Sequence, residues 1–147
     1  GRNNSVFRIF KFRTMTVAED GERVIQAMQN DPRVTRVGRF LRATSIDELP
    51  QLINVLLGEM SIVGPRPHAL VHEERFEDNF DLFSRRRRVL PGITGWAQVN
   101  GYRGETKTPE DVKKRMDYDL YYIDNWSIWL DLEIVVRTFG AVLRGAH

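Results

Sequence analysis

The spacing of apolar residues near the start of the chain predicts an extended segment. In residues 5–15, SVFRIFKFRTM, aromatic and branched side chains alternate with polar ones after an Asn-rich turn. Alternation of this kind is typical of a β-strand. We therefore predict a short strand there, as part of a small sheet.

A helical pattern follows in residues 33–43, RVTRVGRFLRA. Arginines fill most of the polar positions of this segment. Its apolar residues recur at helical spacing, and they are Val34, Val37, Phe40 and Leu41. One apolar stripe on an otherwise charged segment indicates an amphipathic helix. We predict a basic amphipathic helix here.

A second helix is predicted in residues 45–60, SIDELPQLINVLLGEM. Its apolar residues fall on one face, and they are Leu49, Leu52, Ile53, Leu56 and Leu57. Gly58 is a helix stop signal.

The beginning of this helix has two interpretations. Ser45 and Glu48 match a capping box, but Pro50 would then lie beyond the first turn, where its missing N–H is unfavourable. A start one or two residues later places Pro50 in the first turn and Asp47 at or near the N-cap. Either way, two adjacent acids lie at a helix N-terminus.

The rest of the chain predicts further elements in order. We expect an extended stretch, a charged helix, and a short strand with a loop at residues 61–70, 71–90 and 91–104. Thr108-Pro109-Glu110-Asp111 is a clean helix start, and Ser127 opens a last, mostly apolar helix. Without a repeat or a low-complexity linker, residues 1–147 form a single α+β domain, helix-rich with a small sheet.

Composition narrows the chemistry. The chain has 147 residues and no cysteine, which excludes disulfides, a thiolate nucleophile and cysteine-type zinc sites. The net charge is only +2, so any basic surface is local, and nucleic-acid binding is not expected. The sequence contains no apolar window of about 18 residues, which is the length needed to span a bilayer. The chain begins without Met, in a strand-like run, so we expect a piece of a longer protein.

The acid pair is the main candidate for chemistry. Adjacent residues on a helix point about 100° apart, so Asp47 and Glu48 should have different roles. A carboxylate nucleophile suits phosphoryl transfer, and Mg²⁺ is the usual cation where a carboxylate meets phosphate oxygens. Basic residues that could bind phosphate are Lys11, Arg13, Arg42 and Arg66, the last of which lies in a stiff Gly-Pro-Arg-Pro run.

Each of these features also has a purely structural interpretation. Acids in a first turn commonly complement the helix dipole, and the arginines can form a solvated face. His68 and His72 are four residues apart, but without a third ligand we interpret them as structural or surface residues. The arginines at 85–88 are interpreted as a solvated or lipid-facing run rather than as catalytic residues. Residues 128–143 form either a core helix or a membrane-surface helix.

Several stretches together resemble a known family. FRIFKFRTM, DPRVTRVGRFLRATSIDELPQLINVLLGEMSIVGPRPH, PGITGWAQVNGYRGET and DLYYIDNWSIWLDLEIVVRT are similar to the bacterial monotopic phosphoglycosyl transferases. These sugar transferases begin exopolysaccharide, capsule and O-antigen assembly on a polyprenyl phosphate. The His after Gly-Pro-Arg-Pro and the Trp of Gly-Trp-Ala-Gln most resemble the undecaprenyl-phosphate glucose phosphotransferases of the colanic-acid type.

The resemblance implies roles for particular residues. Asp47 would be the nucleophile and Glu48 the ligand of Mg²⁺. Substrate-binding positions would fall on basic and amide side chains within the matching motifs, namely Lys11, Arg13, Arg42, Arg66, Gln98 and Asn100. The implied substrates are a UDP-sugar, with glucose first and galactose or N-acetylated sugars open, and a polyprenyl phosphate.

The resemblance also implies a location at the cytoplasmic face of a bacterial inner membrane, bound through amphipathic surface helices, with a homo-oligomer as an open alternative. Two departures stand out. The family's N-terminal re-entrant membrane helix is absent from this sequence, and Leu90 occupies the place where many members have Arg before Pro-Gly-Ile-Thr-Gly. Two rival functions are a Mg²⁺-dependent phosphodiesterase and a non-enzymatic basic module that binds anionic membrane or nucleic acid.

Overall fold

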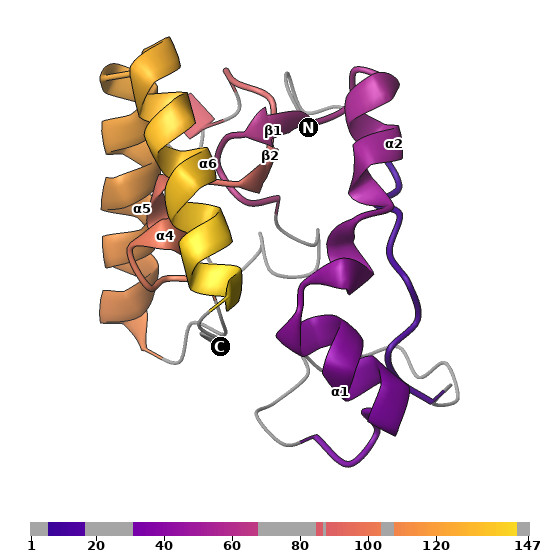
Figure 1. Cartoon of the computed structure of the whole chain (residues 1–147). Coiled ribbons are helices and arrows are strands. Elements are labelled where there is room, and N and C mark those ends of the chain that lie inside the picture. Colours follow the sequence, from indigo (N-terminus) through magenta and orange to yellow (C-terminus); the bar gives the residue numbers. More distant parts are fainter. Residues whose placement is uncertain (1–5, 17–30, 68–84, 87, 104–107, 144–147) are drawn as a thin grey trace.

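A computed structural model of the chain describes residues 6–16, 31–67, 85–86, 88–103 and 108–143 (Figure 1). The described elements are α1 (Arg36–Ala43), the 3₁₀ turn η2 (Ile46–Glu48), α2 (Gln51–Leu56), β1 (Ser61–Val63), β2 (Gly92–Thr94), α4 (Trp96–Val99), α5 (Pro109–Asp124) and α6 (Ile128–Leu143). These helices and the small two-stranded sheet confirm the predicted α+β class.

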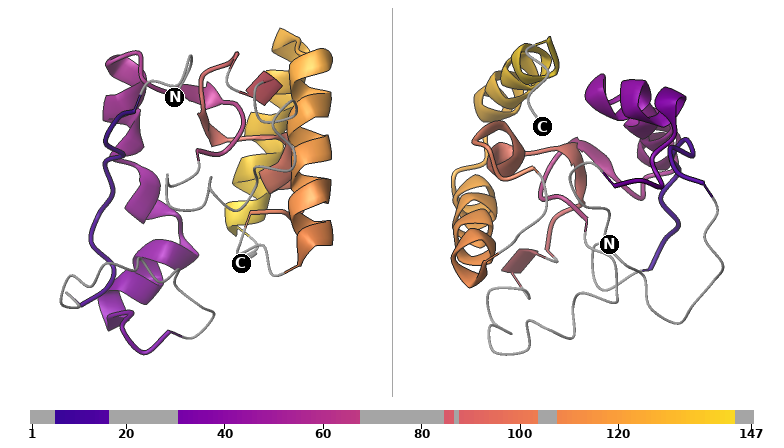
Figure 2. Two further views of the ribbon diagram at one scale, coloured as in Figure 1. Left: turned by 180° about the vertical axis from the view of Figure 1, so that it is seen from behind. Right: turned by 90° about the horizontal axis from the view of Figure 1, so that it is seen from below.

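The helices lie on two sides of the small sheet (Figures 1 and 2). On one side α4 contacts both α5 and α6, and on the other side α1, η2 and α2 follow one another along the chain. The strand β1 contacts both α2 and α6, so the sheet connects the two groups of helices. None of the helices in the described ranges is both long and apolar enough to cross a membrane.

The two strands are parallel, with Ser61 opposite Gly92 and Val63 opposite Thr94. Gly92 permits a close approach here, because a Cβ on it would lie 2.1 Å from the backbone N of Gly64. The strands confirm the extended segments predicted at 61–70 and 91–104 in the part that the structure describes. The helix α4 was not predicted, because its four residues are too short to show a period.

The core lies between the sheet and the two long helices. Val63, Tyr122 and Ile134 are buried together, with Trp96 and Leu130 packed against them. The long helices match their predictions. Thr108 and Asp111 form a capping box at the start of α5, and α6 begins after Ser127.

The helix α2 is oriented opposite to the usual arrangement of an amphipathic helix. Its predicted apolar face is exposed, whereas Gln51 and Asn54 are 2% and 0% exposed. The Asn54 amide accepts a hydrogen bond from Phe10 N at 3.1 Å and donates to Arg8 O at 2.8 Å. The apolar spacing was therefore correct, but this face does not point into the described core.

The strand predicted at 5–15 is wrong for the residues that the structure describes. Only Met15 forms a bridge, to Val34, and the preceding residues run extended without a partner strand. Their backbone bonds go instead to the Asn54 side chain and to the Asp47 carbonyl, which accepts from Phe12 N. The segment therefore lies against η2 and α2 and does not join the sheet.

Most of the charged helix predicted at 71–90 lies outside the described residues, as do His68 and His72.

Candidate functional site

The acid pair occupies a 3₁₀ turn of its own between α1 and α2. Ser45 precedes this turn with φ = 58°, in the left-handed region, and its side chain makes no capping bond. The predicted capping box is therefore wrong. The later start is wrong as well, because the α-helix begins only at Gln51, with Pro50 as its N-cap, and Asp47 belongs to the preceding 3₁₀ turn.

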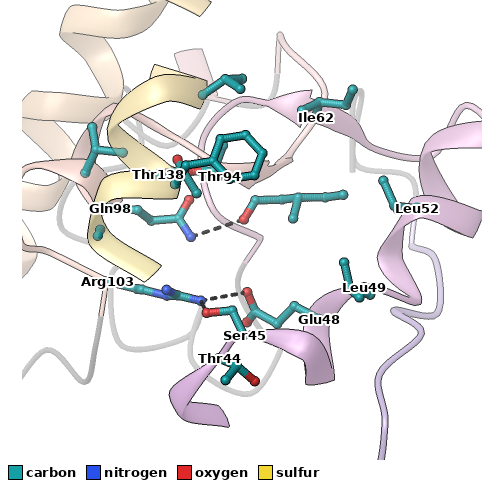
Figure 3. Close-up of a pocket in the computed structure, with 15 residues that line it drawn as sticks. Thr44, Ser45, Glu48, Leu49, Leu52, Ile62, Thr94, Gln98, Arg103 and Thr138 are labelled. Carbon is teal, nitrogen blue, oxygen red and sulfur yellow. Dashed lines mark hydrogen bonds and ion pairs between the residues drawn. The ribbon is translucent and has the colours of Figure 1, made fainter. Parts of the chain in front are cut away.

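Glu48 lies at the centre of a group of cations, of which Figure 3 shows Arg103. Its Oε1 accepts from Arg66 at 2.7 Å and from Lys11 at 2.9 Å, and Arg103 approaches Oε2 at 3.4 Å. Burial alone would raise the pKa of this carboxyl, which is 7% exposed, but Arg66 and Lys11 outweigh it and lower the pKa to about 2. Glu48 is therefore ionised at neutral pH.

Asp47 has a different environment. Its side chain is only partly buried, and within the described ranges it forms no ion pair and no side-chain hydrogen bond. Burial and the negative charge of Glu48 raise its pKa, while Lys11, Arg42 and Arg103 partly offset that rise. The pair thus consists of one carboxylate that is fixed by cations and one that has no side-chain partner among the described residues.

A buried ion pair fixes the backbone of Arg66. Arg86 donates to the main-chain carbonyl of Arg66 at 2.9 Å and pairs with Asp119 of α5 at 2.9 Å. Arg86 and Asp119 are 8% and 2% exposed. The prediction of a solvated or lipid-facing arginine run is wrong for Arg86, while the neighbouring Arg85 is a surface residue that pairs with Asp124.

An apolar cavity of about 290 Å³ opens beside Glu48, between α2 and α6 (Figure 3). Ser45, Glu48 and Arg103 form its polar end, and the remaining lining includes Leu49, Leu52, Ile62, Ile93, Val99, Val135 and Phe139. Asp47 does not line this cavity.

The other predicted site residues lie in different places relative to the acid pair. Arg42 is in the last turn of α1, where its charge lowers the pKa of Asp47. Gln98 lines the cavity, and its amide donates to Ile93 O at 3.2 Å. Asn100 instead donates to Trp96 O at 2.8 Å at the end of α4, and Arg13 is exposed without an ion pair in the described part of the chain.

Sequence reasoning missed Arg103. Its guanidinium donates to Ser45 Oγ at 2.8 Å and faces Glu48 across 55 residues of sequence. The only available signal was its place in the stretch PGITGWAQVNGYRG, next to motif residues that were chosen. A single arginine in a glycine-containing stretch belongs to no periodic pattern that would identify it.

The acid pair alone is a weak cation site. No group of three or more acidic or histidine side chains suited to a metal occurs within the described residues. The Glu48 oxygens already face Lys11, Arg66 and Arg103. Mg²⁺ commonly binds one or two carboxylates together with substrate phosphates, so these residues fit an ion that arrives with a diphosphate.

Comparison with known proteins identifies the family. Residues 1–145 match the family described as Bacterial sugar transferase. A UDP-glucose:undecaprenyl-phosphate glucose-1-phosphate transferase of Escherichia coli (strain K12) is 56% identical over 149 residues, covering 100% of this chain and 32% of that protein. A protein of the same name from Caulobacter vibrioides is 52% identical, covering 97% of this chain and 54% of the relative.

A UDP-N-acetylgalactosamine-undecaprenyl-phosphate N-acetylgalactosaminephosphotransferase of Aeromonas hydrophila is 42% identical, covering 99% of this chain and 34% of that protein. The chain therefore spans between a third and about half of the length of these relatives. The chain belongs to the bacterial sugar transferase family, in agreement with the resemblance of its motifs.

Proposed function

We propose that the protein transfers a sugar-1-phosphate, first of all glucose-1-phosphate, from a UDP-sugar to undecaprenyl phosphate. The names of the relatives support these substrates, and glucose is favoured because the relatives of higher identity carry it in their names. The observation that carries the mechanism is the contrast within the acid pair. Asp47 has no ion pair in the described ranges, whereas Glu48 is fixed by three cations.

In the first step, a carboxylate oxygen of Asp47 attacks the β-phosphorus of the UDP-sugar. The bond from this phosphorus to the bridging oxygen breaks, UMP leaves with that oxygen, and Asp47 carries the phospho-sugar. Lys11, Arg42 and Arg103 lie near enough to influence the charge of Asp47, so they can also offset charge on the diphosphate.

In the second step, a phosphate oxygen of undecaprenyl phosphate attacks the phosphorus held by Asp47. The acyl-phosphate bond breaks, the carboxylate returns, and the product is a polyprenyl diphosphate sugar. Glu48 keeps Lys11, Arg66 and Arg103 at one place through both steps.

Mg²⁺ belongs to this proposal as the ion that would neutralise the diphosphate, with Glu48 as its expected protein ligand. The cations that contact Glu48 would have to share its oxygens with the ion. The UDP-sugar would supply the remaining ligands.

A lipid acceptor places the reaction at a membrane surface, and we assign it to the cytoplasmic face of the bacterial inner membrane. The cytoplasmic face follows from the family resemblance, and exposed apolar side chains on three helices support contact with a membrane surface. Val37 on α1, Leu56 on α2 and Trp129 on α6 are 69%, 87% and 77% exposed. Large exposed apolar areas commonly mark membrane or protein interaction sites.

The test is the Asp47→Asn variant of the natural full-length protein in its membrane, supplied with a UDP-sugar labelled in the sugar. We expect UMP release and the labelled protein adduct to fall to background, because an amide is a poor nucleophile. Asp117→Asn, at an exposed position on α5, is the control and should retain both signals.

An active Asp47→Asn enzyme would refute the nucleophile. Release of free sugar phosphate in place of a lipid-linked product would favour the phosphodiesterase. A panel of UDP-sugars in the same assay identifies the donor.

A further inference from the structure

The apolar cavity beside Glu48 is a groove with two chemically different ends. Leu49 and Leu52 line it on the side that faces α6 (Figure 3), and α6 contributes Val135 and Phe139 to the lining. Leu52 and Phe139 are 46% and 66% exposed, although both line the groove. Large apolar side chains on facing walls indicate an apolar occupant.

The polar end of the groove has capacity for an anion. The guanidinium of Arg103 carries five N–H donors. Its hydrogen bonds within the described residues, to Ser45 and Glu48, both come from Nη2. The donors on Nε and Nη1 thus have no protein acceptor in the described part of the chain, and a guanidinium binds phosphate well.

The groove presents few free hydrogen-bonding groups to a sugar. The hydroxyls of Thr94 and Thr138 bond to each other at 2.7 Å, so they are already paired. The Gln98 Oε1 atom lacks a hydrogen-bond partner in the described ranges, but it is enclosed and presents no acceptor to the groove. A sugar would leave its hydroxyl groups without partners against these walls, which is unfavourable.

We infer that this groove binds the first isoprene units of the polyprenyl phosphate acceptor, with the phosphate at Arg103. The inference rests on the proposed function, because it names where the second substrate of that reaction lies. Charge complementarity selects this occupant. A prenyl phosphate is a branched apolar chain that ends in an anion, and the groove is an apolar channel that ends at a cation beside the acid pair.

The test uses the natural full-length protein in detergent micelles. Leu52→Gln and Phe139→Gln each place an amide in the groove, and both positions are exposed enough for the fold to tolerate the change. The controls are Tyr121→Gln on α5 and Val136→Gln on α6. These residues are 50% and 70% exposed and do not line the groove.

Two reactions are measured for each variant. The first is exchange of labelled UMP into the UDP-sugar, which needs no lipid acceptor. The second is the KM for undecaprenyl phosphate in the complete reaction. We expect each groove variant to raise this KM about tenfold and to leave exchange within about twofold of the wild type, because burial of one such side chain is worth about that factor. The controls should change neither reaction.

The outcomes separate the two proposals. A wild-type protein without UMP exchange would refute the proposed function, and the inference with it. Normal exchange with an unchanged KM in both groove variants would refute the groove alone. Equal increases of KM in groove and control variants would assign the effect to general membrane contact. A joint loss of exchange and thermal stability in the groove variants would show that another protein segment fills the groove. Each of these four results overturns the inference.

Discussion

At the scale of single residues, two neighbouring carboxylates differ because of what surrounds them. In the turn η2, the Glu48 side chain contacts Lys11, Arg66 and Arg103. The side chain of the adjacent Asp47 has no partner in the described ranges. The sequence predicted that Asp47 and Glu48 would differ, since adjacent side chains diverge. It did not predict which cations would surround Glu48, because they lie far away along the chain.

The depressed pKa of Glu48 predicts a pH-dependent contribution to stability. The folded pKa of about 2 lies below the ordinary value of 4.5. The stabilisation is therefore complete above about pH 4.5 and is lost as the pH falls towards 2. We expect Glu48→Gln to lower the free energy of unfolding by about 3 kcal/mol at pH 7.

The measurement is urea unfolding of both proteins across that pH range. The difference between wild type and Glu48→Gln should narrow as the pH falls from 4.5 towards 2. The control is Glu133→Gln, whose ion pair with Arg137 is exposed and should contribute at most about 1 kcal/mol. A difference for Glu48→Gln that does not change with pH would contradict the charge-based explanation.

At the scale of elements, the site is assembled by loops and helix ends that the sheet and α5 hold in place. Arg66 follows β1, and the buried pair of Arg86 with Asp119 ties its backbone to α5. Adjacent arginines thus have unequal roles, although the sequence presents them as one run. Their difference is a matter of burial, which a run of identical residues cannot reveal.

This difference predicts unequal effects of the same substitution. Arg86→Gln leaves Asp119 buried without its partner and should lower the free energy of unfolding by about 3–5 kcal/mol. Arg85→Gln breaks only an exposed pair and should cost about 1 kcal/mol or less. Urea unfolding at pH 7 measures both, and similar losses for the two variants would refute the buried role of Arg86.

At the scale of the whole molecule, a small core coexists with broad apolar exposure. The core centres on Val63, Tyr122 and Ile134, while α1, α2 and α6 each present apolar side chains outward. A helix whose polar side faces the protein and whose apolar side faces outward fits a surface that meets a second apolar phase. We therefore expect these exposed apolar side chains to contact a membrane surface, as the proposed function requires.

We expect the domain to bind lipid vesicles that contain anionic phosphatidylglycerol. On α1, Val37 and Phe40 are 69% and 61% exposed, and exposed arginines flank them. The double variant Val37→Glu/Phe40→Glu should lose most vesicle binding in co-sedimentation, because it places two carboxylates against lipid. The control Tyr121→Glu, at a half-exposed position on α5, should bind as the wild type does. Binding that survives the double variant would exclude α1 from the contact.

The sequence by itself determined most of the helices and singled out Asp47 and Glu48 as the candidates for chemistry. Helical spacing located α1 and α2, and the Thr108-Pro109-Glu110-Asp111 start signal located the beginning of α5. The motifs around Asp47 indicated the family. These features depend on neighbours within a few residues, which one sequence contains in full.

Only the tertiary structure decided which face of α2 turns inward, which cations hold Glu48, and that an apolar groove ends at Arg103. A periodic pattern defines a face but not what the face meets. Contacts between residues 11, 48, 66 and 103 depend on the path of the whole chain. The exposed leucines of α2 follow the same physics, because a second apolar phase would take the place of a protein core.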